Sequence, residues 1–247
     1  MSDRLLTISF GDGKPLPNNV HLARITAVEQ LTWAALTDRL TRTPPVTTDK
    51  SSAGWYCCAE FKGRHRDTEN FVARHCLALD YDHITREQAN HIKARYTKYA
   101  HVMYTTASHT VEAPRIRVVM PLSRPATIDE FQAVSRAVAA LSGIELASRE
   151  SHVPAQMMYM PTVKPGAKFA ARIGVSMTEW IDVDHWLSTY VDWTDKSSWP
   201  HRADHDTLTQ GEKVDPTEKP GVIGAWCRAF SITEAIDRFE LPFERVR

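Results

Sequence analysis

The segment CLALDYDH, residues 76–83, contains the pattern that decides the fold class. Its first half, up to Asp80, is a short apolar run of the kind that forms a buried β-strand. Asp80 and Asp82 stand two positions apart, so on an extended chain both side chains point to the same face. Two carboxylates on one face can bridge hard divalent cations such as Mg²⁺ or Mn²⁺. The alternative interpretation makes Asp82 a turn residue before the next helix and Asp80 a charge at a strand end.

The chain after this strand alternates between helical and extended patterns. Five segments continue it, a helix over 85–96, strands over 101–106 and 116–122, a helix over 128–141 and a strand over 156–160. The first helix begins with a capping box of Thr85 and Gln88, and Pro121 is placed at the end of the third strand. This order predicts a fold of class α/β (α+β) with the split βαβ core of ferredoxin-like and RNA-recognition-type proteins.

That topology predicts where polar residues from distant stretches meet. Right-handed crossovers make the first two strands parallel, with the third between them and antiparallel to both. The end of the first strand, the end of the second and the starts of the third and fourth then share one edge of the sheet. The polar residues expected at this edge are Asp80, Asp82, Ser108, His109, Arg115, Arg117, Glu145 and Glu150.

These residue types suit the transfer of a nucleotide. Two metal ions held by Asp80 and Asp82 would activate a 3′-hydroxyl and neutralise a leaving pyrophosphate. Ser108 and His109 follow the second strand, where the imidazole could donate a hydrogen bond to a phosphate oxygen. Arg115 and Arg117 offer forked donors suited to a triphosphate. Without a role in nucleotide binding, His109 would be a solvated loop residue, and Arg115 and Arg117 would be a charge pair at the edge of the sheet.

Four motifs resemble those of the archaeo-eukaryotic primase superfamily, in its phage and plasmid primase-polymerase branch: LALDYDH (77–83), TTASH (105–109), RIRVVMPLSRP (115–125) and QMMYMP (156–161). The resemblance implies an RNA-recognition-like catalytic core, Asp80 and Asp82 as catalytic metal ligands, and a catalytic His109 that contacts the nucleotide. The superfamily also carries a third acidic residue, which in this sequence falls near Ser148 or Arg149. Glu145 and Glu150 flank that position, and either could complete the metal site.

A second resemblance concerns the end of the chain. Residues 215–239 are similar to the segment that joins such primases to a D5-type helicase, which implies a fused or cognate helicase as partner. The expected organisation is a primase-polymerase domain over 1–190, a linker over 191–220 and the start of a helical adapter over 221–247. Within the first domain we expect an N-terminal subdomain over 1–70 and the catalytic core over 71–175. Ser231 and Glu234 form a capping box that predicts a final helix.

Composition sets limits on the class of protein. The 247 residues are 43% apolar and 24% charged, which is ordinary for a globular protein. We expect a cytoplasmic protein of a bacterial host cell, because no run approaches a membrane span and residues 1–11 do not resemble a signal peptide. The four cysteines lack CxxC spacing, which favours buried free thiols over a zinc site. The formal net charge is +0, so the chain lacks the excess positive charge of an obvious DNA-binding domain.

The leading hypothesis is a DNA primase/polymerase that copies a single-stranded DNA template with NTP or dNTP, using Mg²⁺ or Mn²⁺. The loop with Lys62, Arg64 and Arg66 is a candidate contact for the template backbone. One alternative is a catalytically impaired single-stranded-DNA-binding module fused to a helicase. Another is a metal-dependent nicking nuclease, although the sequence lacks paired histidines at ligand spacing.

Overall fold

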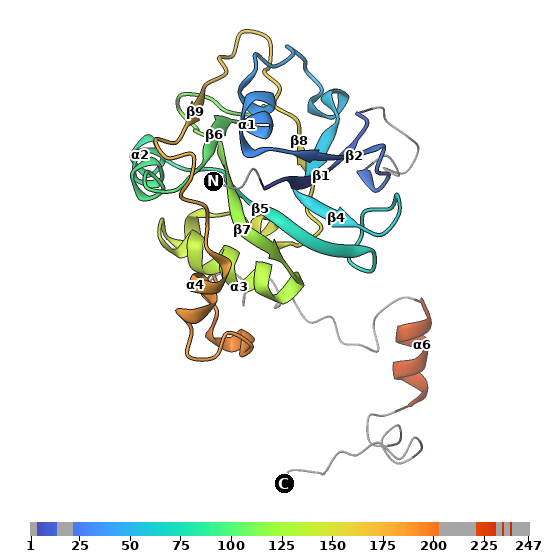
Figure 1. Cartoon of the computed structure of the whole chain (residues 1–247). Helices are drawn as coiled ribbons and strands as arrows, with labels where there is room; N and C mark the ends of the chain where they lie inside the picture. Colours follow the sequence, from blue (N-terminus) through green and yellow to red (C-terminus); the bar gives the residue numbers. More distant parts are fainter. Residues whose placement is uncertain (1–3, 14–21, 203–220, 231–233, 235–237, 239–247) are drawn as a thin grey trace. The chain divides into compact units, whose positions relative to one another are not determined.

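The computed structural model describes residues 4–13, 22–202, 221–230, 234 and 238 (Figure 1). The chain forms two units, Met1–His201 and Arg202–Arg247. In the second unit the described part contains helix α6 (Gly221–Ala229), where the rings of Trp226 and Phe230 pack 5.6 Å apart. Residues 203–220 of the expected linker over 191–220 lie outside the described residues, and so does the capping residue Ser231. No helix in the described segments is long and apolar enough to cross a membrane.

A five-stranded sheet forms the centre of the first unit. Its strands, in order across the sheet, are β4 (Ala59–Phe61), β5 (Phe71–Tyr81), β7 (Ile116–Ala126), β6 (Val102–Thr105) and β9 (Ala171–Ile173). β7 pairs antiparallel with both β5 and β6, so the predicted arrangement of the first three core strands is confirmed. β7 also continues past Pro121, where the sequence pattern predicted its end.

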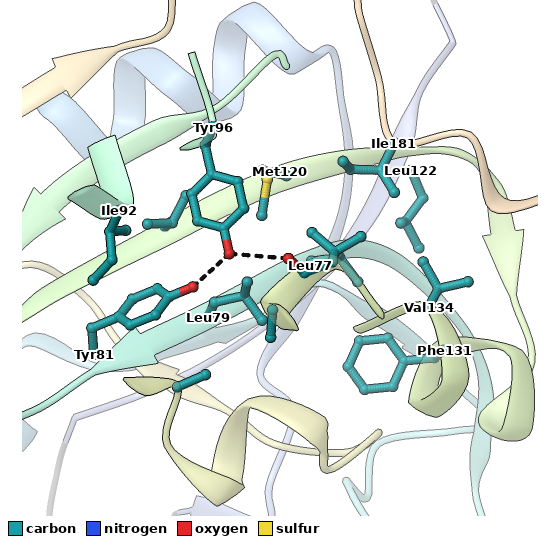
Figure 2. Packing of buried hydrophobic residues seen from close by; sticks show 14 of the residues in the cluster. Leu77, Leu79, Tyr81, Ile92, Tyr96, Met120, Leu122, Phe131, Val134 and Ile181 are labelled. Atoms are coloured by element: carbon teal, nitrogen blue, oxygen red, sulfur yellow. Dashed lines mark hydrogen bonds between the residues drawn. The ribbon is translucent and has the colours of Figure 1, made fainter. Parts of the chain in front are cut away.

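Three helices cover one face of this sheet: α2 (Arg86–Arg95), α3 (Ile128–Ala140) and α4 (Val183–Ser188). The predicted capping box of Thr85 and Gln88 starts α2. Figure 2 shows the core between α2, α3 and the sheet, where the Tyr81 and Tyr96 hydroxyls lie 2.6 Å apart. Both hydroxyls also bind Ser142 Oγ. Burial raises the pKa of Tyr96 to about 12, so these hydroxyls stay protonated and tie the helical layer to the end of β5.

A four-stranded sheet and one helix cover the opposite face. The strands, in order, are β2 (Ala27–Leu31), β1 (Leu6–Gly11), β3 (Trp55–Cys57) and β8 (Met158–Tyr159), and the helix is α1 (Trp33–Thr41). β8 is the predicted fourth strand, but it pairs with β3 and not with the core sheet. β4 takes the edge position beside β5 that a ferredoxin-like fold gives to its last strand. The fold class is thus confirmed, with its fourth strand moved to a second sheet.

The first 70 residues share a core with the rest of the unit. Leu6 and Ile8 of β1 pack with Ala78, Val102 and Val119 of the large sheet, all at 0% exposure. The short run from β3 to β4 passes through Cys58, so one piece of chain belongs to both sheets. The expected N-terminal subdomain is therefore a layer of the same compact unit. The predicted buried free thiols are found at Cys57, Cys58 and Cys76.

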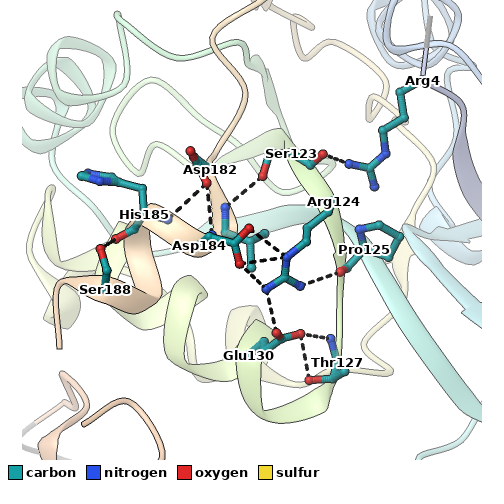
Figure 3. Close-up of polar contacts among 11 residues, drawn as sticks. Arg4, Ser123, Arg124, Pro125, Thr127, Glu130, Asp182, Asp184, His185 and Ser188 are labelled. Atoms are coloured by element: carbon teal, nitrogen blue, oxygen red, sulfur yellow. Dashed lines mark hydrogen bonds and ion pairs between the residues drawn. The ribbon is translucent and has the colours of Figure 1, made fainter. Parts of the chain in front are cut away.

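The compact unit extends beyond the expected boundary at Tyr190. Trp199 is 6% exposed and packs in the helical layer, which brings the turn η5 (Lys196–Ser198) into the domain. Figure 3 shows how the preceding helix α4 is attached. The guanidinium of Arg124 donates to Asp184 Oδ1 at 2.6 Å and to Glu130 Oε1 at 2.8 Å, so it joins α4 to α3.

Candidate active site

Three residues from neighbouring strands form one rung of the large sheet. Asp80 of β5 stands opposite Arg117 of β7, and Arg117 stands opposite Tyr104 of β6. Residues opposite each other in a ladder share a face of the sheet. Tyr81 points into the helical layer, so the alternation of side chains places Asp80 on the face that meets the small sheet.

Arg117 binds the Asp80 carboxylate with two donors. Its Nε lies 2.5 Å from Oδ1 and its Nη2 lies 3.0 Å from Oδ2. The two side chains are only 11% and 15% exposed. Burial alone would lower the pKa of Arg117, but the charge of Asp80 outweighs it and the pKa is raised well above its ordinary value. Arg117 therefore keeps its positive charge, which compensates the carboxylate of the first expected metal ligand.

The same guanidinium joins the rung to the small sheet. Arg117 Nη1 donates to the Tyr159 carbonyl oxygen of β8 at 3.1 Å and to the Tyr104 hydroxyl at 3.2 Å. The Tyr104 hydroxyl in turn lies 2.7 Å from that of Tyr56 on β3. Burial raises the pKa of both phenols, so they act as neutral hydrogen-bonding groups.

The second aspartate is paired with the second arginine. Arg115 Nη1 donates to Asp82 Oδ1 at 3.3 Å, and its Nη2 lies 3.2 Å from His83 Nε2. His83 has a φ of 58°, in the left-handed region that few non-glycine residues adopt, and turns the chain from β5 towards α2. Asp82 is 42% exposed, so this longer ion pair is much less buried than that of Asp80.

A loop occupies the place beside Asp80 where a fourth core strand was expected. The backbone N–H of Ser148 donates to the Asp80 carbonyl oxygen at 2.7 Å, and Ser151 Oγ accepts from the Asp80 N–H at 2.9 Å. This loop carries the short 3₁₀ helices η3 (Ile144–Leu146) and η4 (Arg149–His152). The segment that was expected to supply the third acid is thus held directly against the end of β5.

A buried arginine fixes the far end of that loop. Arg74 is 0% exposed and donates Nη1 to the carbonyl oxygens of Pro154 at 2.8 Å and Gln156 at 3.1 Å. Its Nε donates to the Cys76 carbonyl oxygen at 3.1 Å, and its guanidinium lies over the ring of Phe131. Arg74 therefore connects the loop to β5 and to α3.

These elements surround a cavity of about 200 Å³, which we call the carboxylate cavity. Its charged lining consists of three carboxylates and three cations: Asp80, Asp82, Glu150, Lys50, Arg115 and Arg117. Lys50 comes from the 3₁₀ helix η2 (Lys50–Ala53). Glu150 lines the cavity and Glu145 does not. Across the described residues, no three Asp, Glu, His or Cys side chains are gathered closely enough to hold a metal ion in this conformation.

Ser108 and His109 occupy different surroundings. Ser108 lines the carboxylate cavity, whereas His109 lines a second hollow next to α2, on the helical face of the sheet. His109 Nδ1 accepts a hydrogen bond from the Arg115 backbone N–H at 3.0 Å. Burial lowers the pKa of His109, so the ring is neutral and carries its proton on Nε2. The structure therefore links His109 to Arg115 but leaves it outside the cavity of the aspartates.

The basic loop proposed for the template is partly used inside the fold. Arg66 donates Nε to the Leu22 carbonyl oxygen at 2.9 Å and stacks over the ring of Trp55. Arg64 binds the Thr26 carbonyl oxygen at 3.1 Å, and Lys62 is exposed. None of the three lines either hollow.

Sequence reasoning missed the contributions of Lys50, Tyr56, Tyr104 and Tyr159 to the site. Tyr104 lies within the predicted second strand, two positions from buried Val102. This spacing shows only which face of the sheet Tyr104 is on. Tyr56 and Tyr159 belong to the small sheet, whose pairing has no local signal. Lys50 stands in a stretch without regular periodicity. These residues could be found only from the three-dimensional arrangement.

The fold and the site together define a class of protein, an α+β domain whose central sheet ends at a cavity lined by paired carboxylates and arginines. Comparison with family models then identifies the family. The model of the VapE N-terminal domain matches residues 46–202, and the chain belongs to that family. The match confirms the resemblance to the phage and plasmid primase-polymerase domains.

One solved structure resembles this chain. The AEP domain of the Cyanophage S-2L primase-polymerase is similar with a TM-score of 0.42 and 12% sequence identity, covering 76% of this chain and 89% of that one. The search of curated proteins found no match. Neither result assigns an activity to this chain.

Proposed function

We propose that this domain is a metal-dependent nucleotidyltransferase that adds nucleotides from NTP or dNTP to a 3′-hydroxyl on a single-stranded DNA template. The observation that carries the proposal is the meeting of Asp80, Asp82 and Glu150 at one cavity, opposite cationic side chains. Family membership supports the same class of reaction.

The donor chemistry fits Mg²⁺ or Mn²⁺, because carboxylate oxygens are the ligands that hard divalent cations prefer. Asp80, Asp82 and Glu150 would hold the ions, which when bound would activate the hydroxyl and neutralise the leaving pyrophosphate. The bidentate contact with Arg117 uses one lone pair of each Asp80 oxygen, so each oxygen keeps another acceptor site. Binding of a metal ion at Asp82 requires its partner Arg115 to move or to share the carboxylate.

The cavity size indicates which part of the substrate it accepts. At about 200 Å³ it is smaller than the roughly 300–1,000 Å³ of a typical small-molecule site. It therefore accepts the phosphate portion of a nucleotide, while the base and sugar lie outside. Lys50 and Arg115 line its walls, from which they would contact phosphate oxygens.

Asp82→Asn is the sharpest test of the transfer reaction. Asp82 forms one long ion pair near the surface. Its substitution should therefore change the free energy of unfolding, obtained from a thermal melt, by less than about 1 kcal/mol. Incorporation of labelled nucleotide on a primed template in Mn²⁺ should fall at least roughly a hundredfold. Asp38→Asn is the matched control, because Asp38 forms an exposed pair with Arg42 away from the cavity. Full incorporation by Asp82→Asn would refute the proposal.

A second candidate function is a single-strand-binding module without transfer activity. The observation that favours it is that both aspartates are already paired with arginines. In this case the parent protein should incorporate no nucleotide in either Mg²⁺ or Mn²⁺. Its affinity for a single-stranded oligonucleotide should be unchanged by Asp82→Asn.

A further inference from the structure

A second hollow lies at the same end of the large sheet, on the opposite face from the carboxylate cavity. Its volume is about 440 Å³, within the range of small-molecule sites. Residues of α2, β6, β9 and the loop before β7 line it, and Tyr104 lines both hollows. We call it the cationic hollow, because Arg86, Lys93 and Arg172 supply its charged groups.

The three cations converge because α2 and β9 direct them towards the same space. Arg86 and Lys93 stand seven positions apart on α2, two turns of helix, and therefore lie on one face of it. Arg172 of β9 stands opposite Met103 of β6, and opposite residues in a ladder share a face. Met103 packs in the helical layer, so the register directs Arg172 towards α2.

Among the described residues, no acidic side chain lines the hollow or forms an ion pair with these three cations. The lining contains no aspartate or glutamate, whereas the carboxylate cavity has three carboxylates against three cations. Within the described part of the chain, Arg86, Lys93 and Arg172 form no ion pair. Lys93 is also partly buried, so its charge is less well solvated than that of a surface lysine. Like charges brought together without a counter-charge favour binding of an anion.

The floor of the hollow is apolar. Met103, Pro114 and Ile116 are buried there, and Val111 stands exposed at the rim with 71% exposure. Asn90 and His109 supply uncharged polar groups, and the Nε2–H of His109 is a donor. Cations around an apolar floor match a ligand that combines phosphate oxygens with a sugar and a base.

We propose that the cationic hollow binds the phosphate groups of a nucleic-acid strand or of a free nucleotide. It does so separately from the carboxylate cavity and without a metal ion. The inference is independent of the proposed transfer reaction, because Asp80, Asp82 and Glu150 do not line this hollow. His109, Val111 and Pro114 of the loop between β6 and β7 line this hollow, and Ser108 and Arg115 of the same loop line the carboxylate cavity.

The test compares two double charge reversals in the presence of EDTA. Arg86→Glu with Arg172→Glu changes two exposed residues of the hollow, and Lys98→Glu with Lys164→Glu makes the same change in net charge away from it. Binding of a labelled single-stranded oligonucleotide is measured by fluorescence anisotropy across a salt series. Binding of ATP is measured by calorimetry. Circular dichroism melts check that each variant is folded.

We expect the hollow variant to lose at least tenfold in affinity for one of the two ligands, while the control variant loses less than twofold. If the strand is the ligand, the slope of log K against log salt should decrease by roughly 1.4, because two contacts are lost. A loss for ATP alone identifies a free nucleotide as the source of the phosphate. Equal losses in both variants, or no loss in a folded hollow variant, would overturn the inference. Because EDTA is present, these assays report binding alone, and failure of the transfer reaction would appear separately in the incorporation assay.

Discussion

Arg117 binds both oxygens of the Asp80 carboxylate, with Nε 2.5 Å from Oδ1 and Nη2 3.0 Å from Oδ2. The two residues face each other in the ladder between β5 and β7. The first of the two expected metal ligands is thus held in place by a buried cation of the same sheet. Alanine at position 80 would leave that cation unpaired, which makes it a poor test of catalysis alone.

Replacement of Arg117 should have a large effect on stability. Arg117→Leu leaves the Asp80 carboxylate buried without its partner, which should lower the free energy of unfolding by about 3–5 kcal/mol. Urea unfolding at pH 7 measures the change. Arg42→Leu breaks an ion pair whose side chains are 71% and 61% exposed, and should cost less than about 1 kcal/mol. Similar losses in both variants would contradict the structural role of the Asp80 pair.

The two glutamates that the sequence left open should differ in metal binding. Glu150 lines the carboxylate cavity and Glu145 does not. We expect Glu150→Gln to weaken Mn²⁺ binding roughly tenfold, because one anionic oxygen ligand is lost. Glu145→Gln should change it less than twofold. Titration of Mn²⁺ followed by electron paramagnetic resonance measures both, and a larger effect at Glu145 would assign the third acid to that residue.

Arg74 should be important for the loop beside Asp80. Arg74→Met leaves the buried carbonyl oxygens of Cys76, Pro154 and Gln156 without this donor, at a cost of about 2–4 kcal/mol in unfolding free energy. Thermal or urea unfolding measures the loss. Hydrogen exchange should also become faster at Ser148, whose N–H binds the Asp80 carbonyl oxygen. Arg64→Met, which removes one exposed bond, is the control, and an equally small change in Arg74→Met would refute the prediction.

His75 should make stability depend on pH. Burial, and then the charges of Arg4 and Arg74, lower its pKa to about 4, against about 6.5 in an unfolded chain. The unfolded chain therefore binds a proton first as pH falls, and the stability present above pH 6.5 decreases between pH 6.5 and pH 4. The decrease due to this residue is on the order of 3 kcal/mol. In His75→Leu the loss of stability over this interval should be smaller by that amount, and an unchanged slope would contradict the assignment.

The centre of the fold was predictable because it lies between two layers. β5 is covered on one face by helices and on the other by the small sheet, so its residues 76–79 form a continuous apolar run. Pro121 misled the prediction of the end of β7. It stands opposite Cys76, next to a register irregularity between Arg74 and Cys76, where the ladder is interrupted. A proline without an N–H is tolerated there.

The site was predicted in part. Periodicity places Asp80 and Asp82 on one side, and both line one cavity. The pairing of Asp80 with Arg117 needs the exact register of β5 on β7, which no local pattern contains. His109 was expected near the aspartates because it follows a strand that ends at the same edge. A sheet edge has two faces, and a loop residue can lie on either one. Its bond to the Arg115 backbone holds His109 on the helical side.

The passage of one short run of chain through both sheets has a practical consequence. β3 contributes Tyr56 to the small sheet, and β4, which follows after Cys58, flanks β5 in the large one. A gene fragment starting at residue 71 would encode the aspartates without β4, which pairs with the start of their strand. Dissecting this protein therefore calls for boundaries that keep everything from β1 to Trp199 together.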